Sequence, residues 1–423
     1  MTNVREQLDE RLYRTTGPNG VQVVTEHLPG LRSAAVGVWV RTASAHEPVH
    51  LMGTAHLLEH MVFKGTEHRS AKEIAHELEI RGGSLDAYTS RDHTSYQAHV
   101  LDADLTLATD ILTDLVRRPA LSATDLDLER NVVLEEIKGV LDTPDDLVFD
   151  LFATSLWPQH PYGYSILGTP ETVGAISIAD LKTFHAQGYY PGNCIITAAG
   201  NVEHERLLDD LAKFGWFDDP GFEAPRSPVG HRPAVRGGSD FVPRETAQTH
   251  IVFGTDTFEA RDDRRYPLAI LTNMFGGGMS SRLFQRVREE LGLAYAVYAF
   301  QHSYRATGLV GVYVGTQPKT AAKARAAIEA EYRQLATEGL TDEELRGGRQ
   351  QLKGQLMLAL ENPTSRMNRL AGFALNDDRY RNLDEVLAAI DRVSRDEMMA
   401  VAREFFAPER LTTIELGGTT RTT

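Results

Sequence analysis

The sequence is poor in cysteine, in long apolar runs and in positive charge. Cys194 is the only cysteine among 423 residues, so no internal disulfide can form, and its apolar strand-like surroundings predict a buried thiol rather than a nucleophile. No apolar run approaches the ~20 residues that a membrane-spanning helix needs. Acidic residues outnumber basic ones, 59 to 44, and the net charge of −15 argues against a nucleic-acid partner.

The length and the first residues set further bounds. A chain of 423 residues with 42% hydrophobic content can bury one or two full cores, and its length alone suggests two or three domains. The first ten residues are charged and lack the apolar segment of a secretory signal, so we expect a cytoplasmic protein without a membrane partner. The acidic charge would attract basic peptides to an enclosed cavity, or it would serve solubility alone.

The segment 53–63 places two histidines and a glutamate on one side of a predicted helix. His56 and His60 are four residues apart and therefore share a face, on which Glu59 is a neighbour. Two imidazoles at this spacing are half of a zinc site, and zinc lowers the pKa of its water to roughly 7 so that a carboxylate can take the proton. The order H-x-x-E-H is that of inverted zinc peptidases. Two surface histidines are the alternative.

A catalytic zinc needs a third protein ligand, and the best candidate lies downstream. In the predicted helix 128–140, Glu129 and Glu136 are seven residues apart and fall on nearly the same face. Glu135 is the fallback ligand, although it is rotated by about 100° from Glu136. The alternative is an acidic helix face exposed to solvent.

These motifs resemble the pitrilysin family of inverted zinc peptidases. The H-x-x-E-H motif is followed, after 75 residues, by Glu136 in the frame Glu-Arg-x-Val-Val-Leu-x-Glu. The chain is most similar to the short, two-domain branch that includes the mitochondrial processing peptidase beta subunit and bacterial homologues, and the likeness runs from about Asn19 to Gly418. Further similar segments are Gly82–Thr89, His160–Gly163, Ile166–Glu171 and Gly276–Phe284.

The resemblance implies roles for five residues. His56, His60 and Glu136 would bind one zinc ion per chain, Glu59 would be the general base, and Glu129 would be a second carboxylate that supports the site. We therefore expect a zinc-dependent metalloendopeptidase.

An internal repeat with an offset of 217 residues organises the chain. The segment 177–200 aligns without gaps on 394–417, and both read as helix, turn with proline, strand and glycine. At this offset Glu129 and Glu136 fall on Arg346 and Lys353, which cannot bind zinc, and no H-x-x-E-H occurs after residue 60. Only the first copy is equipped for catalysis.

The repeat predicts two homologous domains of α+β class. Alternating apolar strands and long amphipathic helices indicate, in each, a mostly antiparallel sheet with helices packed on one face. We expect a zinc-binding domain over residues 1–218, an extended linker rich in proline and glycine over 219–240, and a second domain without the zinc motif over 241–423.

The second copy has polar residues of its own. Arg288 and Tyr295 are seven residues apart after a glycine turn, and the resemblance implies that this pair binds substrate near the scissile carbonyl. A guanidinium and a phenol can both donate hydrogen bonds to a developing oxyanion. Arg286 and Tyr298 are the local competitors.

The segment 82–89 resembles the exposed edge strand on which relatives hold an extended peptide. Unpaired backbone groups of an edge strand give affinity without reading sequence. Substrate contacts are therefore expected at Gly83, Leu85, Asp86 and Ala87. Relatives usually have asparagine where this chain has Asp86, and a carboxylate can only accept hydrogen bonds.

The expected activity is hydrolysis of unfolded peptides or presequence-like segments. One alternative is a non-catalytic structural homologue, against which the complete set of zinc-site residues argues. Another is the active subunit of a heterodimeric processing peptidase. Because Arg288 and Tyr295 occur on the same chain as the zinc motif, we expect a homodimer.

Overall fold

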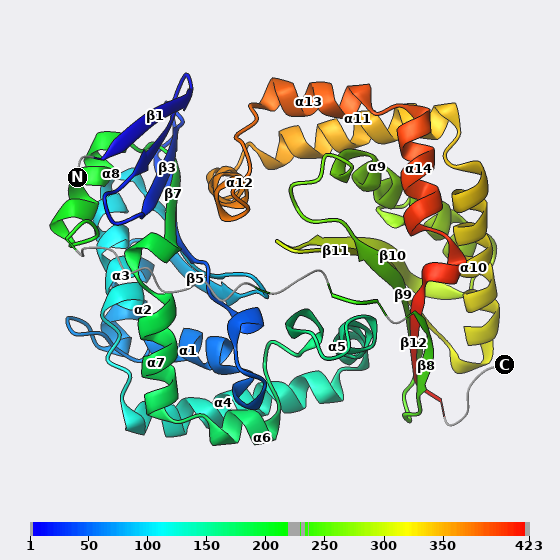
Figure 1. Cartoon of the computed structure of the whole chain (residues 1–423), viewed down its shortest axis with the longest axis horizontal. Coiled ribbons are helices and arrows are strands. Elements are labelled where there is room, and N and C mark those ends of the chain that lie inside the picture. The colour runs from blue at the N-terminus through cyan, green and yellow to red at the C-terminus, as the bar shows by residue number, and fades with distance from the viewer. Residues whose placement is uncertain (1–2, 219–228, 230–232, 236, 419–423) are drawn as a thin grey trace. The chain divides into compact units, whose positions relative to one another are not determined.

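The structure is a computed structural model that describes residues 3–218, 229, 233–235 and 237–418 (Figure 1). It divides into two compact units, and each is made of three pieces of chain. Unit 1 contains residues 1–137, 165–229 and 359–380, and unit 2 contains residues 138–164, 230–358 and 381–423.

Unit 1 is built on a seven-stranded sheet. The strand order is β1-β2-β3-β7-β4-β6-β5, and every neighbouring pair is antiparallel except β3 and β7. The strands are β1 (Val4–Asp9), β2 (Leu12–Thr16), β3 (Gln22–His27), β4 (Ser33–Val40), β5 (Ser84–Thr89), β6 (Thr94–Leu101) and β7 (Cys194–Gly200).

Helices from the same half of the sequence pack on one face of this sheet. Their apolar side chains form the main core with alternate residues of the strands, such as Val36 and Val38 of β4. The helices of unit 1 are α1 (Thr54–Val62), α2 (Ala71–Glu79), α3 (Leu105–Arg117), α4 (Ala123–Asp142, as far as residue 137), α6 (Pro170–Ala175), α7 (Ile178–Gly188), α8 (His204–Lys213) and, from the other half, α12 (Pro363–Leu375).

Helix α12 covers the opposite face of the first sheet (Figure 1). Leu370 and Ala371 of α12 are buried with Ala35 and Trp39 of β4, which point away from the main core. Strand β4 is apolar at nearly every position because both of its faces are covered. This second covered face was not part of the sequence prediction.

Unit 2 repeats the plan with five strands in the order β10-β11-β9-β12-β8, of which only β12 and β8 are parallel. The strands are β8 (Gly238–Val242), β9 (Thr249–Thr257), β10 (Ala294–Ser303), β11 (Gly308–Thr316) and β12 (Thr412–Leu416). The helices are α5 (Pro144–Leu156), α9 (Arg265–Gly276), α10 (Ala321–Glu338), α11 (Asp342–Ala359), α13 (Leu383–Arg392) and α14 (Arg395–Phe405).

The predicted fold class, two homologous α+β domains, is confirmed by this shared topology. The order β3-β7-β4-β6-β5 of unit 1 corresponds to β8-β12-β9-β11-β10 of unit 2, including the one parallel pair. Helices α7 and α14 lie 217 residues apart, which is the offset of the repeat. None of the helices in the described part of the chain has the length and apolar composition that a membrane span requires.

The compact units differ from the expected ranges 1–218 and 241–423 because the two halves exchange a helix. Helix α5 follows α4 in the first half but packs against β9 and β12 of unit 2, whereas α12 follows α11 in the second half and packs in unit 1. Helices α4 and α11 carry the chain from one unit to the other. The position of the domain boundary itself stays a prediction.

Most of the expected linker 219–240 lies outside the described residues, namely 219–228, 230–232 and 236. Its last three residues, 238–240, belong to β8, where they pair with β12. The local sequence gives no sign of this strand, because its parallel partner β12 lies far along the chain, and the extent of the linker stays a prediction.

Candidate metal centre

Helix α1 begins at a glycine that no other residue could replace without strain. Gly53 has a φ of 94°, and a Cβ atom there would lie 2.6 Å from the carbonyl oxygen of Leu167. The buried N–H groups at the start of the helix, which have no partner within it, find an acceptor in the carboxyl group of Glu47, which lies 2.8 Å from the nitrogen of Gly53 and 2.5 Å from that of Ala55. This contact fixes the start of the helix and with it His56 in the first turn.

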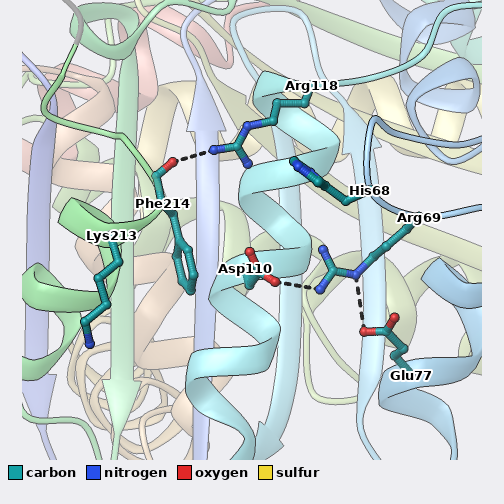
Figure 2. Close-up of a pocket in the computed structure, with 7 residues that line it drawn as sticks. All are labelled: His68, Arg69, Glu77, Asp110, Arg118, Lys213 and Phe214. Carbon is teal, nitrogen blue, oxygen red and sulfur yellow. Dashed lines mark hydrogen bonds and ion pairs between the residues drawn. The ribbon is translucent and has the colours of Figure 1, made fainter.

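The segment that follows α1 is fastened to α3. Arg69 forms ion pairs with Asp110 at 2.6 Å and Glu77 at 3.2 Å, and it also contacts the buried Asp114. Figure 2 shows the contacts of Arg69 with Asp110 and Glu77 in a pocket of about 380 Å³, where Arg118 donates to the carbonyl oxygen of Phe214. No predicted site residue lines this pocket, and its charged side chains are engaged in ion pairs, either with one another or with the neighbouring Asp114 and Asp210. The network fixes Arg69, in the segment that follows α1, to α2 and α3.

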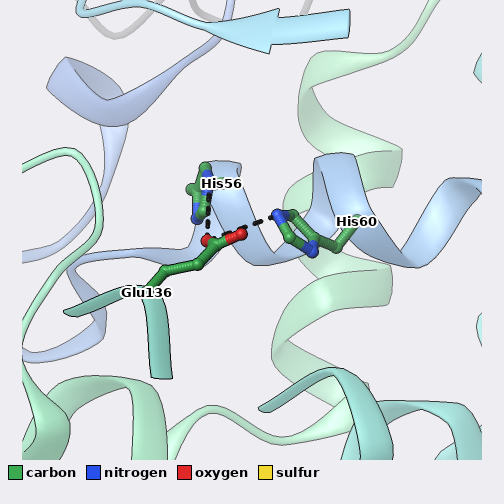
Figure 3. A group of neighbouring side chains, drawn as sticks. All are labelled: His56, His60 and Glu136. Carbon is green, nitrogen blue, oxygen red and sulfur yellow. Dashed lines mark ion pairs between the residues drawn. The ribbon is translucent and has the colours of Figure 1, made fainter. Parts of the chain in front are cut away.

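Three side chains from α1 and α4 converge on one point (Figure 3). The Nε2 atoms of His56 and His60 lie 3.7 Å and 3.6 Å from the Oε2 atom of Glu136. One donor atom from each of the three residues lies within 4.8 Å of the other two, and within the described residues this is the one such group of three or more histidine, cysteine or acidic side chains. The expected ligand triad is therefore assembled in space, while metal binding itself stays a prediction.

The donor set fits zinc. Tetrahedral zinc with bonds of roughly 2.0–2.2 Å places its donor atoms roughly 3.3–3.6 Å apart, close to the separations observed here. Burial and the neighbouring His60 lower the pKa of His56 to about 4, so His56 is neutral near pH 7 and its ring nitrogen can act as a ligand. Two imidazoles and one carboxylate also match the three-ligand sets of catalytic zinc.

The other acidic residues of α4 are placed differently. Glu129 is largely buried, and its Oε2 atom lies 3.2 Å from Nδ1 of His60 while its Oε1 atom lies 2.7 Å from Nζ of Lys64. Glu135 is exposed and does not belong to the convergent group. The structure thus places Glu129 against the ring nitrogen of His60 that does not face Glu136. The fallback residue Glu135 is not part of the convergent group.

Glu59 lies on α1 between the two histidines and next to the edge of the sheet. The hydroxyl of Thr89, the last residue of β5, donates a hydrogen bond of 2.5 Å to its Oε2 atom. Burial raises the pKa of Glu59, and the bond from Thr89 opposes that rise. Oε1 is the other oxygen of this carboxylate. The expected general base, Glu59, is therefore held at one of its two oxygens by β5, the strand that was expected to bind substrate.

Strand β5 is an edge of the first sheet, as the sequence analysis expected. Its side chains alternate: Asp86 is exposed, whereas Leu85 and Ala87 are partly buried and pack against the core. Gly83 precedes the strand and lies close to β6, where a Cβ atom would meet Val100 at 2.9 Å. Substrate contacts at these residues stay a prediction.

Arg288 and Tyr295 lie together in unit 2. The guanidinium of Arg288, in the π-helical turn Phe284–Glu290, stacks on the ring of Tyr295 at 4.5 Å and donates to its carbonyl oxygen at 3.1 Å. Tyr295 is 79% exposed, which leaves its hydroxyl accessible. The competitors are engaged elsewhere: Arg286 pairs with Glu290, and Tyr298 packs beside another tyrosine of the sheet.

Two family profiles match the chain. Insulinase (Peptidase family M16) matches residues 22–170, and Peptidase M16 inactive domain matches residues 175–352. An uncharacterised zinc protease of Streptomyces coelicolor is 38% identical over 397 residues, which are 92% of this chain and 86% of that protein. The chain belongs to peptidase family M16. The expected resemblance to pitrilysin-type peptidases of the short two-domain form is confirmed.

Other M16 relatives agree. An uncharacterised zinc protease of Bacillus subtilis is 37% identical over 399 residues, covering 94% of this chain and 96% of its own. Among solved structures, a protease from Helicobacter pylori has a TM-score of 0.90 at 22% identity, covering 96% of this chain and 99% of that one. A peptidase M16 inactive domain from Pseudomonas fluorescens has a TM-score of 0.89 at 18% identity, with 97% and 99% covered. At these identities the two structures show the M16 fold alone.

Three residues around the M16 site were missed by the sequence analysis: Glu47, Lys64 and Thr89. Lys64 follows His60 by four residues, a helical spacing that would have indicated proximity to the metal centre. Glu47 and Thr89 reach α1 from loops and strands, so no local spacing could have identified them.

Proposed function

We propose that this protein is a zinc-dependent endopeptidase that hydrolyses unfolded peptides or presequence-like segments, with one zinc ion per chain. The observation that carries the proposal is the convergence of His56, His60 and Glu136, with Glu59 on the same helix. The zinc-protease names of the M16 relatives support it at the level of the family. Zinc bound by such a set activates water and polarises a carbonyl group.

The side chains of the site have separate tasks in this proposal. Glu59 takes the proton of the attacking water at Oε1, because Oε2 is occupied by the hydrogen bond from Thr89. His56 and His60 would hold the zinc ion through Nε2, the ring nitrogen that faces Glu136 in both cases. Arg288 and Tyr295 donate hydrogen bonds to the oxygen of the scissile carbonyl.

The form of the substrate follows from the edge strand. A peptide that adds to β5 must be extended, and its main chain supplies most of the hydrogen bonds, so sequence stringency is low. Segments inside a stably folded protein are already paired and are poor substrates. Efficient digestion of such a protein under native conditions would count against the proposal. Cytoplasmic location stays a prediction.

Metal analysis of single variants, combined with turnover of an unstructured peptide, tests the proposal. Glu59→Gln should keep about one zinc ion per chain and lose turnover by roughly 10²–10⁴-fold, because it removes the base but no ligand. His60→Ala and Glu136→Gln should lose the zinc itself. Glu135→Gln is the matched control, and it should keep both zinc and turnover. Retention of zinc by Glu136→Gln together with its loss from Glu135→Gln would reverse the ligand assignment.

A further inference from the structure

Lys64 lies next to the candidate metal centre, where it contacts Glu129. It follows His60 by four residues, just beyond the end of α1, and its Nζ atom is 2.7 Å from Oε1 of Glu129. The other oxygen of the same carboxylate, Oε2, is 3.2 Å from Nδ1 of His60. Glu129 therefore bridges a lysine and one of the expected ligands.

The environment of Glu129 makes its lysine partner important. The Glu129 side chain is only 9% exposed. Burying a carboxylate without a counter-charge costs on the order of several kcal/mol of folding free energy. Among the described residues, Lys64 is the cationic side chain that forms an ion pair with Glu129. Without the ammonium group, the free energy of the Glu129 carboxylate would be lower if it turned toward solvent or toward the metal.

His60 and His56 differ in how their rings are held. Nδ1 of His60 faces Glu129, so its Nε2 is directed at Glu136. The Nδ1 atom of His56 is buried and has no hydrogen-bond partner in the part of the chain that the structure describes. The contact between Glu129 and Nδ1 therefore fixes the orientation of the His60 ring from the side away from the metal.

The backbone of Lys64 is itself well fixed. Its N–H donates to the carbonyl oxygen of Met61 at 3.2 Å, in the last turn of α1. The next residues close a short turn, in which the N–H of Thr66 donates to the carbonyl oxygen of Arg69 at 2.8 Å. Arg69 is anchored to α3 by its ion pair with Asp110 and to α2 by its ion pair with Glu77 (Figure 2). The segment that carries Lys64 to Glu129 is therefore tied to its surroundings on both sides of the lysine.

We propose that Lys64 is a positioning residue of the metal centre: its ammonium group holds the Glu129 carboxylate against Nδ1 of His60, so that Nε2 of His60 faces the metal. This inference rests on the proposed zinc site and adds to it a residue that acts through Glu129. Partners that orient a metal-binding histidine typically contribute 10–100-fold to metal affinity.

A direct electrostatic effect of Lys64 on the metal would change the zinc affinity in the opposite direction. An ammonium group near a dication repels it, so a lysine that acted by its charge alone would weaken zinc binding, and its removal would strengthen it. A lysine that acts by orientation strengthens binding, and its removal weakens it. The sign of the change in zinc affinity therefore separates the two roles.

The experiment measures the zinc Kd of the full-length protein by competition with a chelator of known affinity. Lys64→Met keeps the length of the side chain but removes the charge, and we expect a Kd about tenfold higher, at the low end for such partners. Lys64→Arg should restore most of the affinity. Lys72→Met, at an exposed position of α2, is the matched control and should leave the Kd unchanged. The thermal unfolding midpoint of the metal-free variants reports any general loss of structure.

A double-mutant cycle shows whether Lys64 acts through Glu129. In a Glu129→Gln background, Lys64→Met should have little further effect on the zinc Kd. An unchanged or lower Kd for Lys64→Met, or an equal tenfold loss in the Glu129→Gln background, overturns the inference. A wild-type protein that binds no zinc removes both proposals. A protein that binds zinc with the expected Lys64 dependence but hydrolyses no peptide removes the proposed function alone.

Discussion

His204, the first residue of α8, is a buried side chain through which we expect acid to destabilise the folded protein. Its two ring nitrogens each lie 2.8 Å from a threonine hydroxyl, Thr15 on β2 and Thr25 on β3. Burial lowers the pKa of His204 to about 4, from an ordinary value of 6.5. The position at a helix N-terminus also disfavours a positive charge.

The sign of the effect on stability follows. Between pH 6.5 and 4 the unfolded chain binds a proton at this residue and the folded chain does not, so the free energy of unfolding falls as the pH is lowered through that window. We expect His204→Asn to show a shallower fall than the wild type, by roughly one proton in the linkage slope near pH 5. Urea unfolding at a series of pH values measures this. Parallel profiles for the two proteins would show that His204 is not the group responsible.

At this scale, part of the site is visible in the sequence. The four-residue spacing of His56 and His60 and the seven-residue spacing of Glu129 and Glu136 are helical periods, so each pair could be placed on one face. That the two faces meet depends on the packing of α1 and α4 in one core, which local spacing does not determine. The likeness to a known family supplied that link.

At the scale of elements, the exchanged helix α12 is an integral part of the first core. Met367, Leu370 and Ala371 are buried against β3, β4 and β7. Two polar contacts attach the ends of the helix: Arg366 pairs with Glu26 of β3, and Arg41 donates to a carbonyl oxygen in its last turn. Unit 1 therefore depends on residues from the second half of the sequence.

Substitution within α12 should destabilise the first unit. Leu370 is fully buried, so Leu370→Ala should cost about 2–5 kcal/mol in the free energy of unfolding. Hydrogen exchange should accelerate in β4 and β7 more than in β9 and β11. Leu358→Ala, at a position of α11 that is 76% exposed, is the control and should change stability by less than about 0.5 kcal/mol. Faster exchange confined to unit 2 would contradict this assignment of α12.

The sequence indicates that each of the two segments has a buried face, but it does not indicate that they pack against each other. The nearly continuous apolar run 34–40 is typical of a strand covered on both faces, and the spacing of the apolar residues in 367–374 is that of an amphipathic helix. Neither pattern says that the two segments meet, because they are more than 300 residues apart and belong to different copies of the repeat. Periodicity identifies a buried face but not its partner.

At the scale of the whole molecule, we propose that two chains form a homodimer in which Arg288 and Tyr295 of one chain serve the zinc site of the other. Glu59→Gln and Tyr295→Phe should each be poorly active alone. When they are mixed and subunits exchange, heterodimers would hold one intact site, and about a quarter of the wild-type activity should return in a random mixture.

A matched control accompanies this mixture. Glu59→Gln combined with Glu136→Gln can produce no intact site, because both changes damage the same half of the chain, and that mixture should stay inactive. Subunit exchange is verified by mass measurement of differently tagged chains. If exchange occurs and the Glu59→Gln and Tyr295→Phe mixture stays as inactive as its parents, each site is built within one chain, or Tyr295 has no part in it.

The reciprocal transfer of α5 and α12 has a meaning for the origin of the molecule. It is the arrangement expected when two copies of a half-length ancestor swap one helix each and their genes later fuse into one reading frame. A backbone break engineered between residues 218 and 238 would then release neither half, since each unit contains chain from both. Conversely, either half synthesised alone would lack a helix that its sheet requires, so the two would have to be produced together to fold.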